Sequence, residues 1–355
     1  MAQLYLDRNS NRFLSPQGAV RDYGQWLTLD AVFARSTEID QLSLHPQVEY
    51  RRYSGSSSAN AADALLEAAF SHKGEKLNYD LEAVYSDRGT LISELETTGI
   101  VAAAARQQQA TAGFGLTDQI TERQSVRVQA AYANVEYPKG ESVGLVAYHN
   151  TFASLIYNFN YSVADSFSSA VLANQDVAPR YGNDSRSAGM RVGWTHLFSP
   201  TARISAAIGA NRARLDNEAS YGSSWAIQAE RSYELTDLSL GLMRDIKPNG
   251  LGLLIRRDVL KASAVRHLSP RYEVTLSLLS AQNRNAVAAG IVDDRRYASG
   301  VIGLGYHYSP SMLVNAQLRG SAARYPGNSS TNRDANGWQA ILMATWTPSP
   351  YSISR

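Results

Sequence analysis

The chain has 355 residues, of which 44% are hydrophobic and 19% charged, and its formal net charge is only +2. This balance excludes the strongly basic footprint of a nucleic-acid-binding protein, and the longest apolar run, Ile100–Ala105, is far shorter than the roughly 20 residues of a membrane helix. There is no cysteine, so disulfides and thiolate metal sites are excluded as well.

The amino terminus, Met1–Ser10, has no basic segment followed by an apolar one, as a secretion signal would have. It therefore predicts either a protein that is not exported or a mature chain with an added methionine. The segment "AQLYLD" within it is a first predicted strand, and a polar link from Arg8 to Gly24 follows.

From Gln25 to Trp346 apolar and polar residues alternate with a period of two, which is the pattern of β-strands with one apolar face. The clearest segments are Leu42–Tyr50, Leu77–Tyr85, Val126–Tyr132, Ala188–Trp194 and Tyr272–Leu278. Seventeen such segments, together with the first strand, predict 18 strands. Sixteen is the alternative, because the first strand and residues 253–268 are weakly patterned.

The connections alternate between short turns, such as "FSPTAR" and "YSPS", and long polar links rich in Gly, Asn and Ser. Ser-Pro suits the first two positions of a type I turn. Short turns at one end and long loops at the other indicate an antiparallel meander whose ends face different environments. We predict one domain over residues 1–355, with a tail after Trp346 that lies outside the strand pattern.

The apolar faces could pack against a second sheet or solenoid layer in a soluble protein, or they could face lipid. Predicted strands of roughly 9 to 12 residues match a tilted membrane-crossing strand rather than the usual soluble strand. Aromatic residues also gather near the ends of the apolar series, as in interfacial girdles. They are Tyr50, Tyr132, Trp225 and Trp338 toward long loops and Phe33, Trp194, Tyr306, Tyr308 and Trp346 toward short turns. Arg231 is a misfit, because it shares the parity of the apolar series.

The polar faces carry charges in mid-strand, which a water-filled lumen accepts. The predicted lumen-lining residues are Glu49, Arg51, Asp80, Glu82, Arg127, Arg191, Glu230, Lys261 and Arg319. Facing groups of opposite sign would form a constriction with a transverse field. In the alternative, these groups form salt bridges that fill the interior and leave no open path.

The sequence contains no recognisable catalytic or metal-binding motif. His45, His149, His196, His267 and His307 lie singly in predicted strands and His72 lies in a turn, without metal-ligand spacing. Nucleophile elbows, phosphate loops and dinucleotide fingerprints are also absent from the sequence. We therefore predict no catalytic residue, no metal site, no cofactor and no enzyme. A hydrolase site assembled at the rim from distant strands is the alternative.

Two long links carry more than turn residues. The acidic cluster Val292–Arg296 could bind a divalent cation, although solvated loop charge is the simpler interpretation. The link Gly89–Gln109 contains helix-compatible Leu, Glu and Ala residues, and it could fold inward as a plug or form an external cap.

The whole chain resembles bacterial outer-membrane β-barrel proteins. Within that class, Asp87–Val101 and Leu116–Tyr137 look like a barrel family found with exopolysaccharide gene clusters. The resemblance implies an outer-membrane location and a role near polysaccharide secretion. Such barrels often end on an aromatic residue, whereas here "TPSPYSISR" follows Trp346.

The predicted function is an outer-membrane conduit with a charged, water-filled lumen, for exopolysaccharide export or for passage of hydrophilic solutes. Expected partners are outer-membrane lipid and lipopolysaccharide, with polysaccharide and periplasmic export components as further ones, and no nucleic acid. The alternative is a structural or surface-binding barrel with a blocked lumen.

Overall fold

The computed structural model describes residues 1–11, 14, 19–55, 60–90, 105–138, 145–178, 183–215, 218–248, 254–285, 295–324 and 334–349. The strands of this part, in chain order, are β1 (Ala2–Asn9), β2 (Asp22–Asp30), β3 (Phe33–Ser36), β4 (Asp40–Tyr53), β5 (Ala61–Lys73), β6 (Leu77–Gly89), β7 (Arg106–Thr121), β8 (Gln124–Glu136), β9 (Tyr148–Asn160), β10 (Asp165–Ala178), β11 (Asn183–Ser199), β12 (Ala202–Leu215), β13 (Glu218–Ser232), β14 (Thr236–Pro248), β15 (Leu254–Ser269), β16 (Tyr272–Asn285), β17 (Arg295–Ser309), β18 (Met312–Arg324) and β19 (Asp334–Trp346). Among these described residues, no helix has the length and hydropathy needed to cross a membrane.

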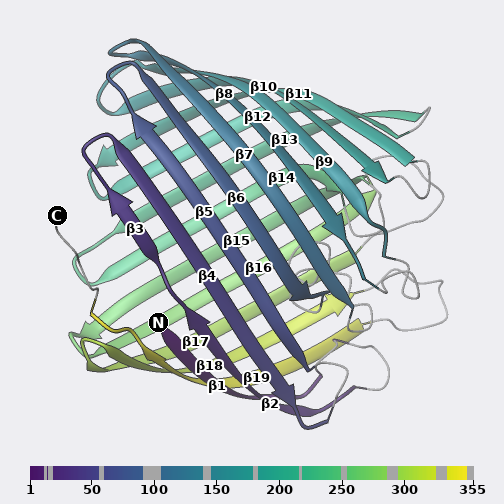
Figure 1. Ribbon diagram of the computed structural model, residues 1–355, viewed down its shortest axis with the longest axis vertical. Coiled ribbons are helices and arrows are strands. Elements are labelled where there is room, and N and C mark those ends of the chain that lie inside the picture. Colours follow the sequence, from purple (N-terminus) through teal and green to yellow (C-terminus); the bar gives the residue numbers. More distant parts are fainter. Residues whose placement is uncertain are drawn as a thin grey trace.

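The strands form one closed antiparallel barrel in which each strand pairs with the next in sequence (Figure 1). The ladder closes where β1 pairs with β19, from Ala2 opposite Trp346 to Asn9 opposite Gln339. Segments β2 and β3 both pair with β4 and together form one strand of the wall. The barrel therefore has 18 strands, and the prediction of 18 rather than 16 is confirmed.

The break between β2 and β3 has a cause in the neighbouring strand. Asp30 pairs with Gln47 and Phe33 with Leu44, so the register is the same on both sides of the break. Pro46 lies opposite the break and has no N–H to donate, although its carbonyl still accepts a hydrogen bond from the Ala31 N–H at 3.1 Å. The missing donor interrupts the ladder without ending the strand.

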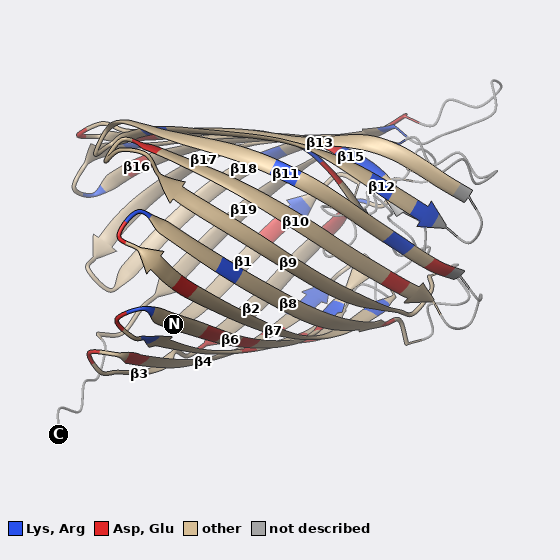
Figure 2. Cartoon of the chain, turned by 90° about the horizontal axis from the view of Figure 1, so that it is seen from above, with Lys and Arg blue, Asp and Glu red and all other residues tan. Residues whose placement is uncertain are grey.

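Met1, the short turns and the end of β19 at Trp346 lie at one end of the barrel, and the strand ends that the longer connections join lie at the other (Figure 2). Three Ser-Pro turns share one construction, a register shift just before the turn, at Ser199, Ser269 and Ser309. At Ser269 the hydroxyl oxygen accepts hydrogen bonds from the backbone N–H of Arg271 and of Tyr272, both at 3.2 Å. Ser199 likewise accepts from the Thr201 N–H at 3.3 Å, so these two serines satisfy backbone donors within the short turns.

The strands are longer than the 9 to 12 residues expected from the alternation, since most have 13 to 17. Arg106–Gln109 begin β7, so the prediction that placed them in a long link is wrong at that end. The hydrogen-bonded wall continues past the segment in which apolar residues alternate, because backbone pairing does not require apolar side chains.

The ladder register separates the two faces of the wall. Leu276 faces Ile302 across β16–β17, and both side chains are about half exposed on the outside. Thr275 and Glu273 face Gly303 and Gly305 on the inside, where a β-carbon on either glycine would collide with the opposing side chain. The predicted girdle residues all share the outward parity, including Tyr308, which is 69% exposed. Their place at a membrane interface stays a prediction.

Substitution of arginine on the two faces of β16 tests this division. Leu276→Arg places a charge on the outward face and should destabilise the barrel in a bilayer by roughly 2–4 kcal/mol. Ser277→Arg, on the exposed part of the inner face, should cost far less. Thr275 is a poorer control, because it lies against Gly303. The measurement is the free energy of unfolding in lipid vesicles, and equal losses for the two variants would contradict the assignment.

Candidate functional site

The candidate site is the inner wall. The register places every predicted lumen-lining residue on the inward face, opposite in parity to the exposed leucine and valine rows. The structure adds what spacing cannot indicate, namely which of these charges pair with one another and which do not.

One buried ion network lies on the wall of β2, β4 and β5. The Arg51 guanidinium donates to the carboxylates of Glu49 and Asp63, and it is only 6% exposed. Thr28 donates to Glu49 at 3.0 Å, and Arg106 Nη1 lies 3.5 Å from Asp63 Oδ1. Asp63 is absent from the predicted set, because β5 reads "AADALLEAAF" and lacks a clear alternation. Each charged group of this network has a partner of opposite sign.

A second pair bridges a strand. Arg127 on β8 donates from Nη2 to Asp80 Oδ1 on β6 at 2.7 Å, and from Nη1 to Thr117 at 3.1 Å. The two side chains meet above Gly115 on the intervening strand β7, where a β-carbon would lie 2.5 Å from both Arg127 Nη2 and Asp80 Oδ2. Glycine is therefore required for the bridge, and both charged groups remain partly exposed to the interior.

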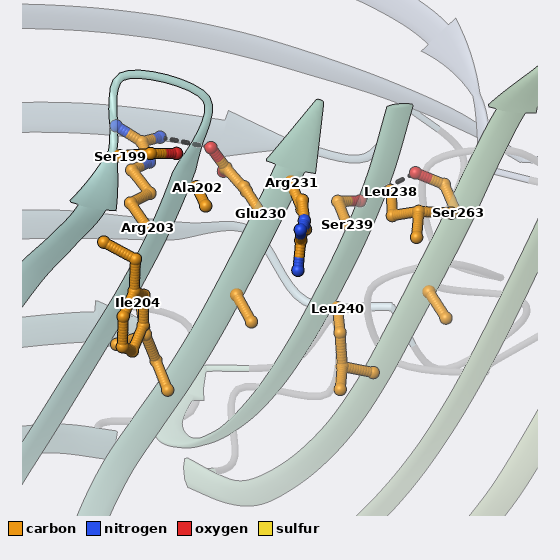
Figure 3. Close-up of a pocket in the computed structure, with 13 residues that line it drawn as sticks. Ser199, Ala202, Arg203, Ile204, Glu230, Arg231, Leu238, Ser239, Leu240 and Ser263 are labelled. Atoms are coloured by element: carbon orange, nitrogen blue, oxygen red, sulfur yellow. Dashed lines mark hydrogen bonds and ion pairs between the residues drawn. The ribbon is translucent and has the colours of Figure 1, made fainter. Parts of the chain in front are cut away.

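A third pair lies near the short-turn end on β12 and β13. Arg203 Nη2 is 2.7 Å from Glu230 Oε2, and Ser239 and Ser263 share a hydrogen bond of 2.7 Å on the next two strands (Figure 3). A hollow of about 770 Å³ beside them is lined by residues of both parities, and Ala202, Ile204 and Arg231 in its lining belong to the outward face, so it is not a hollow of the lumen. Arg203 is a site residue that the sequence missed, because it follows directly on a predicted turn.

Other predicted charges have no ion pair within the described part of the chain. They are Glu82 on β6, Arg191 on β11, Lys261 on β15 and Arg319 on β18. In the ladder order β6 and β15 lie on opposite sides of the barrel. Glu82 and Lys261, both exposed, therefore place opposite charges on facing walls, as the transverse-field hypothesis requires.

The interior is not uniform along the barrel axis. On the inner face of β15, Ile255, Arg257 and Val259 toward the long-loop end are buried, whereas Lys261 and Ser263 nearer the short-turn end are exposed. Apolar clusters also pack inside the long-loop end, one around Leu14 and Tyr297 and another around Val135 and Leu145. The water-accessible part of the interior thus opens toward the short turns.

An aromatic pair also faces inward. Tyr5 on β1 stacks on Trp26 on β2, with ring centroids 4.7 Å apart and planes inclined by 21°. The Tyr5 hydroxyl donates to Gln3 Oε1 at 2.6 Å, and the Glu49 network lies on the adjoining strand. The sequence gives no sign of this pair beyond the parity of the two residues.

The histidines have local partners. His72 Nδ1 is 2.7 Å from Asp40, His196 Nδ1 is 2.8 Å from Asp165, and His45 Nδ1 is 3.1 Å from Glu67. No group of three or more His, Asp or Glu side chains with metal-site geometry occurs among the described residues. Most of the Gly89–Gln109 link and the acids of Val292–Arg296 lie outside the described residues.

The same barrel occurs in solved bacterial proteins. The chain is similar to OccAB2 of Acinetobacter baumannii, with a TM-score of 0.51 and 13% identity over 97% of this chain and 96% of that one. It is also similar to OccAB4 of the same organism (TM-score 0.50, 8% identity, 97% and 96% covered) and to the FrpB iron transporter of Neisseria meningitidis, F5-1 variant (0.53, 8%, 96% and 67%). No protein-family model and no curated protein matches the sequence. Similarity at these identities establishes the barrel fold.

The buried network and the exposed pair should respond differently to loss of their arginine. Arg51→Met removes the nearer counter-charge of the Asp63 carboxylate, which is 4% exposed and keeps only Arg106 at 3.5 Å, and should cost about 3–5 kcal/mol of unfolding free energy. Arg203→Met removes an exposed partner of Glu230 and should cost less than about 1 kcal/mol. Guanidinium titrations of the refolded variants in vesicles measure both, and a small loss for Arg51→Met would contradict the buried network.

Proposed function

We propose that the chain is an outer-membrane conduit for hydrophilic solutes, with its long loops facing the outside of the cell. The observation that carries this proposal is a closed barrel whose outward face is apolar and whose inner face holds exposed charges on opposite walls. A closed ladder leaves no unpaired backbone edge in hydrocarbon. A barrel of 18 strands encloses a lumen wide enough for water.

The barrels to which the chain is similar include an iron transporter, which supports transport over catalysis as the general role. In this proposal the conduit works by geometry and charge, and no residue acts as a nucleophile or a general base. The buried inner wall at the long-loop end is the narrow part of the path, and the exposed charges of Lys261 and Glu82 lie on the walls of the wider part.

Ion selectivity in planar bilayers tests the conduit. Lys261→Glu changes the inner wall by two unit charges. At about 10 Å in water this alters the energy of a passing ion by about 0.8 kcal/mol, or about fourfold in the population of each ion at low salt. The anion-to-cation permeability ratio should fall by at least that factor.

Two further variants serve as controls. Glu82→Lys should shift the permeability ratio in the opposite direction. Arg266→Glu, on the outward face of the same strand as Lys261, should leave it unchanged. Silence of the wild-type protein at all voltages would contradict the conduit and would favour the blocked, surface-binding barrel.

A polysaccharide is the second candidate cargo, because the inner wall carries the stacked Tyr5 and Trp26 beside the Glu49 network. Aromatic faces next to hydrogen-bonding groups suit sugar rings, whose C–H faces stack while their hydroxyls bind polar groups. The exopolysaccharide resemblance of Asp87–Val101 and Leu116–Tyr137 favours the same cargo, with periplasmic export components as partners.

Block of the channel current by a linear neutral oligosaccharide tests this cargo. Trp26→Leu should weaken the block, because it removes the inner aromatic face. Tyr23→Leu, which changes an outward aromatic residue on the same strand, should not. A block of equal strength in both variants would remove the polysaccharide from the proposal and leave the solute conduit in place.

A further inference from the structure

The hollow of about 770 Å³ on β12–β15 is lined by two neighbouring rows of outward side chains, close to the short turns. The row nearer the turns consists of Ala202, Arg231 and Leu238. The next row consists of Ile204, Ala229, Leu240 and Ala262. In Figure 3, Ile204 and Leu240 stand apart on the wall, and Arg231 lies above the space between them. The hollow is therefore a feature of the outer surface of the barrel.

Large and small side chains alternate across the hollow. The ladder sets Ile204 against Ala229 and Leu240 against Ala262, so each large side chain has a small one beside it. Leu238 and Leu240, which are 41% and 43% exposed, form a ridge along β14. The small residues leave one trough along β13 and another along β15, on the two sides of this ridge. Two parallel apolar troughs fit two extended hydrocarbon chains.

Each trough ends toward the short turns at an exposed arginine. Arg231 ends the trough on β13, and its guanidinium lies 4.5 Å from the centre of the Tyr233 ring. Arg266 ends the trough on β15, where it stands opposite Thr236 of β14. Because β13 and β15 are only about 10 Å apart, the two arginine side chains can reach one group that lies over Thr236.

Within the described part of the chain, no carboxylate forms an ion pair with Arg231 or Arg266. The acids near the short turns on the strands of this wall face inward, and they are Glu230, Asp237 and Glu273. Glu234, in the turn between β13 and β14, is not paired with either arginine. Parity thus keeps the acids of the wall on the other side of the sheet, and a ligand can supply the negative charge.

We propose that this hollow binds a diacyl phospholipid, with one acyl chain in each trough and the phosphate between Arg231 and Arg266. Guanidinium groups bind phosphate oxygens in pairs, and the Thr236 hydroxyl lies on the strand between the two arginines. The inference rests on the proposed function, since a barrel whose long loops face outward turns this wall toward the phospholipid leaflet on the periplasmic side. The bound lipid lies outside the lumen and takes no part in conduction.

The test uses the full-length protein in detergent, with dioleoyl phosphatidylglycerol as the probe and native mass spectrometry as the readout. Arg231→Gln/Arg266→Gln changes two exposed outward side chains and no ion pair of the described chain, so the variant should fold. It should bind the phospholipid at least about tenfold more weakly than the wild type, because charge-assisted hydrogen bonds to the phosphate are lost. Dioleoylglycerol, which has the same chains without the phosphate, should bind the wild type as weakly as the phospholipid binds this variant.

A second variant, Ala229→Leu/Ala262→Leu, fills both troughs while keeping both arginines, and it should weaken binding by a similar factor. Its matched control is Ala112→Leu/Ala130→Leu, on the outward face of β7 and β8, which should leave the affinity unchanged. Equal binding by the wild type and by the arginine variant would overturn the site, as would equal binding of phosphatidylglycerol and dioleoylglycerol. Lipid-free dimerisation of the wild type that is lost in Ala229→Leu/Ala262→Leu would also overturn it, by assigning the hollow to a second copy.

Planar-bilayer current, recorded in parallel, separates this site from the conduit. Phosphate-dependent lipid binding by a barrel that stays silent at all voltages supports the site and contradicts the conduit. Normal current from a barrel whose lipid binding does not depend on the phosphate contradicts the site and leaves the conduit standing.

Discussion

The structure depends on one pairing, that of β1 with β19. An open sheet of this size would leave two rows of backbone N–H and C=O groups without partners, and hydrocarbon cannot supply them. The closing strand has only eight residues and its partner has 13, yet all eight are in register. The same demand explains why the ladder resumes after Pro46 in an unchanged register rather than ending there. Closure gives each strand an inward and an outward face, and the apolar and charged side chains are divided between these two faces.

Inside the barrel, small residues decide where charges can meet. Gly115 lets Asp80 and Arg127 join across an intervening strand, and Gly24 in the same way leaves room for Asp7 and Tyr53. The Arg127–Asp80 contact joins two strands that are not neighbours in the ladder, in addition to the backbone hydrogen bonds of the wall. Where the interior is packed, the charges are paired and buried, as at Arg51. Where it opens to water, charges such as Lys261 need no partner. One inner wall thus combines a packed region with a solvated one.

The alternation of the sequence was sufficient to predict the strand number and the face on which each charge lies, because parity along a strand does not depend on its neighbours. The partners of those charges depend on the stagger between strands, which parity leaves open. The stacking of Tyr5 on Trp26 was missed for this reason. Asp63 was missed because β5 has no clear alternation, and Arg203 because it follows directly on a predicted turn. The strand lengths were underestimated for a different reason. The backbone ladder of β7 includes Gln107 and Gln109, where apolar and polar residues do not alternate, so the sequence pattern does not indicate that the strand continues there.

If the barrel spans a membrane as proposed, the residues that break the apolar parity mark the two edges of its apolar band. On β13 the outward positions between Tyr221 and Arg231 are Ser223, Trp225, Ile227 and Ala229. The ten steps from Tyr221 to Arg231, at about 3.3 Å each and a tilt of about 40°, rise by about 25 Å, which is the height of an outer-membrane apolar band. Arg231 stacks on Tyr233 at 4.5 Å toward the short turns, and Arg212 stacks on Tyr221 toward the loops. In the proposed membrane orientation, the misfit at Arg231 is the boundary of the apolar band toward the short turns, and Arg212 with Tyr221 is its boundary toward the long loops.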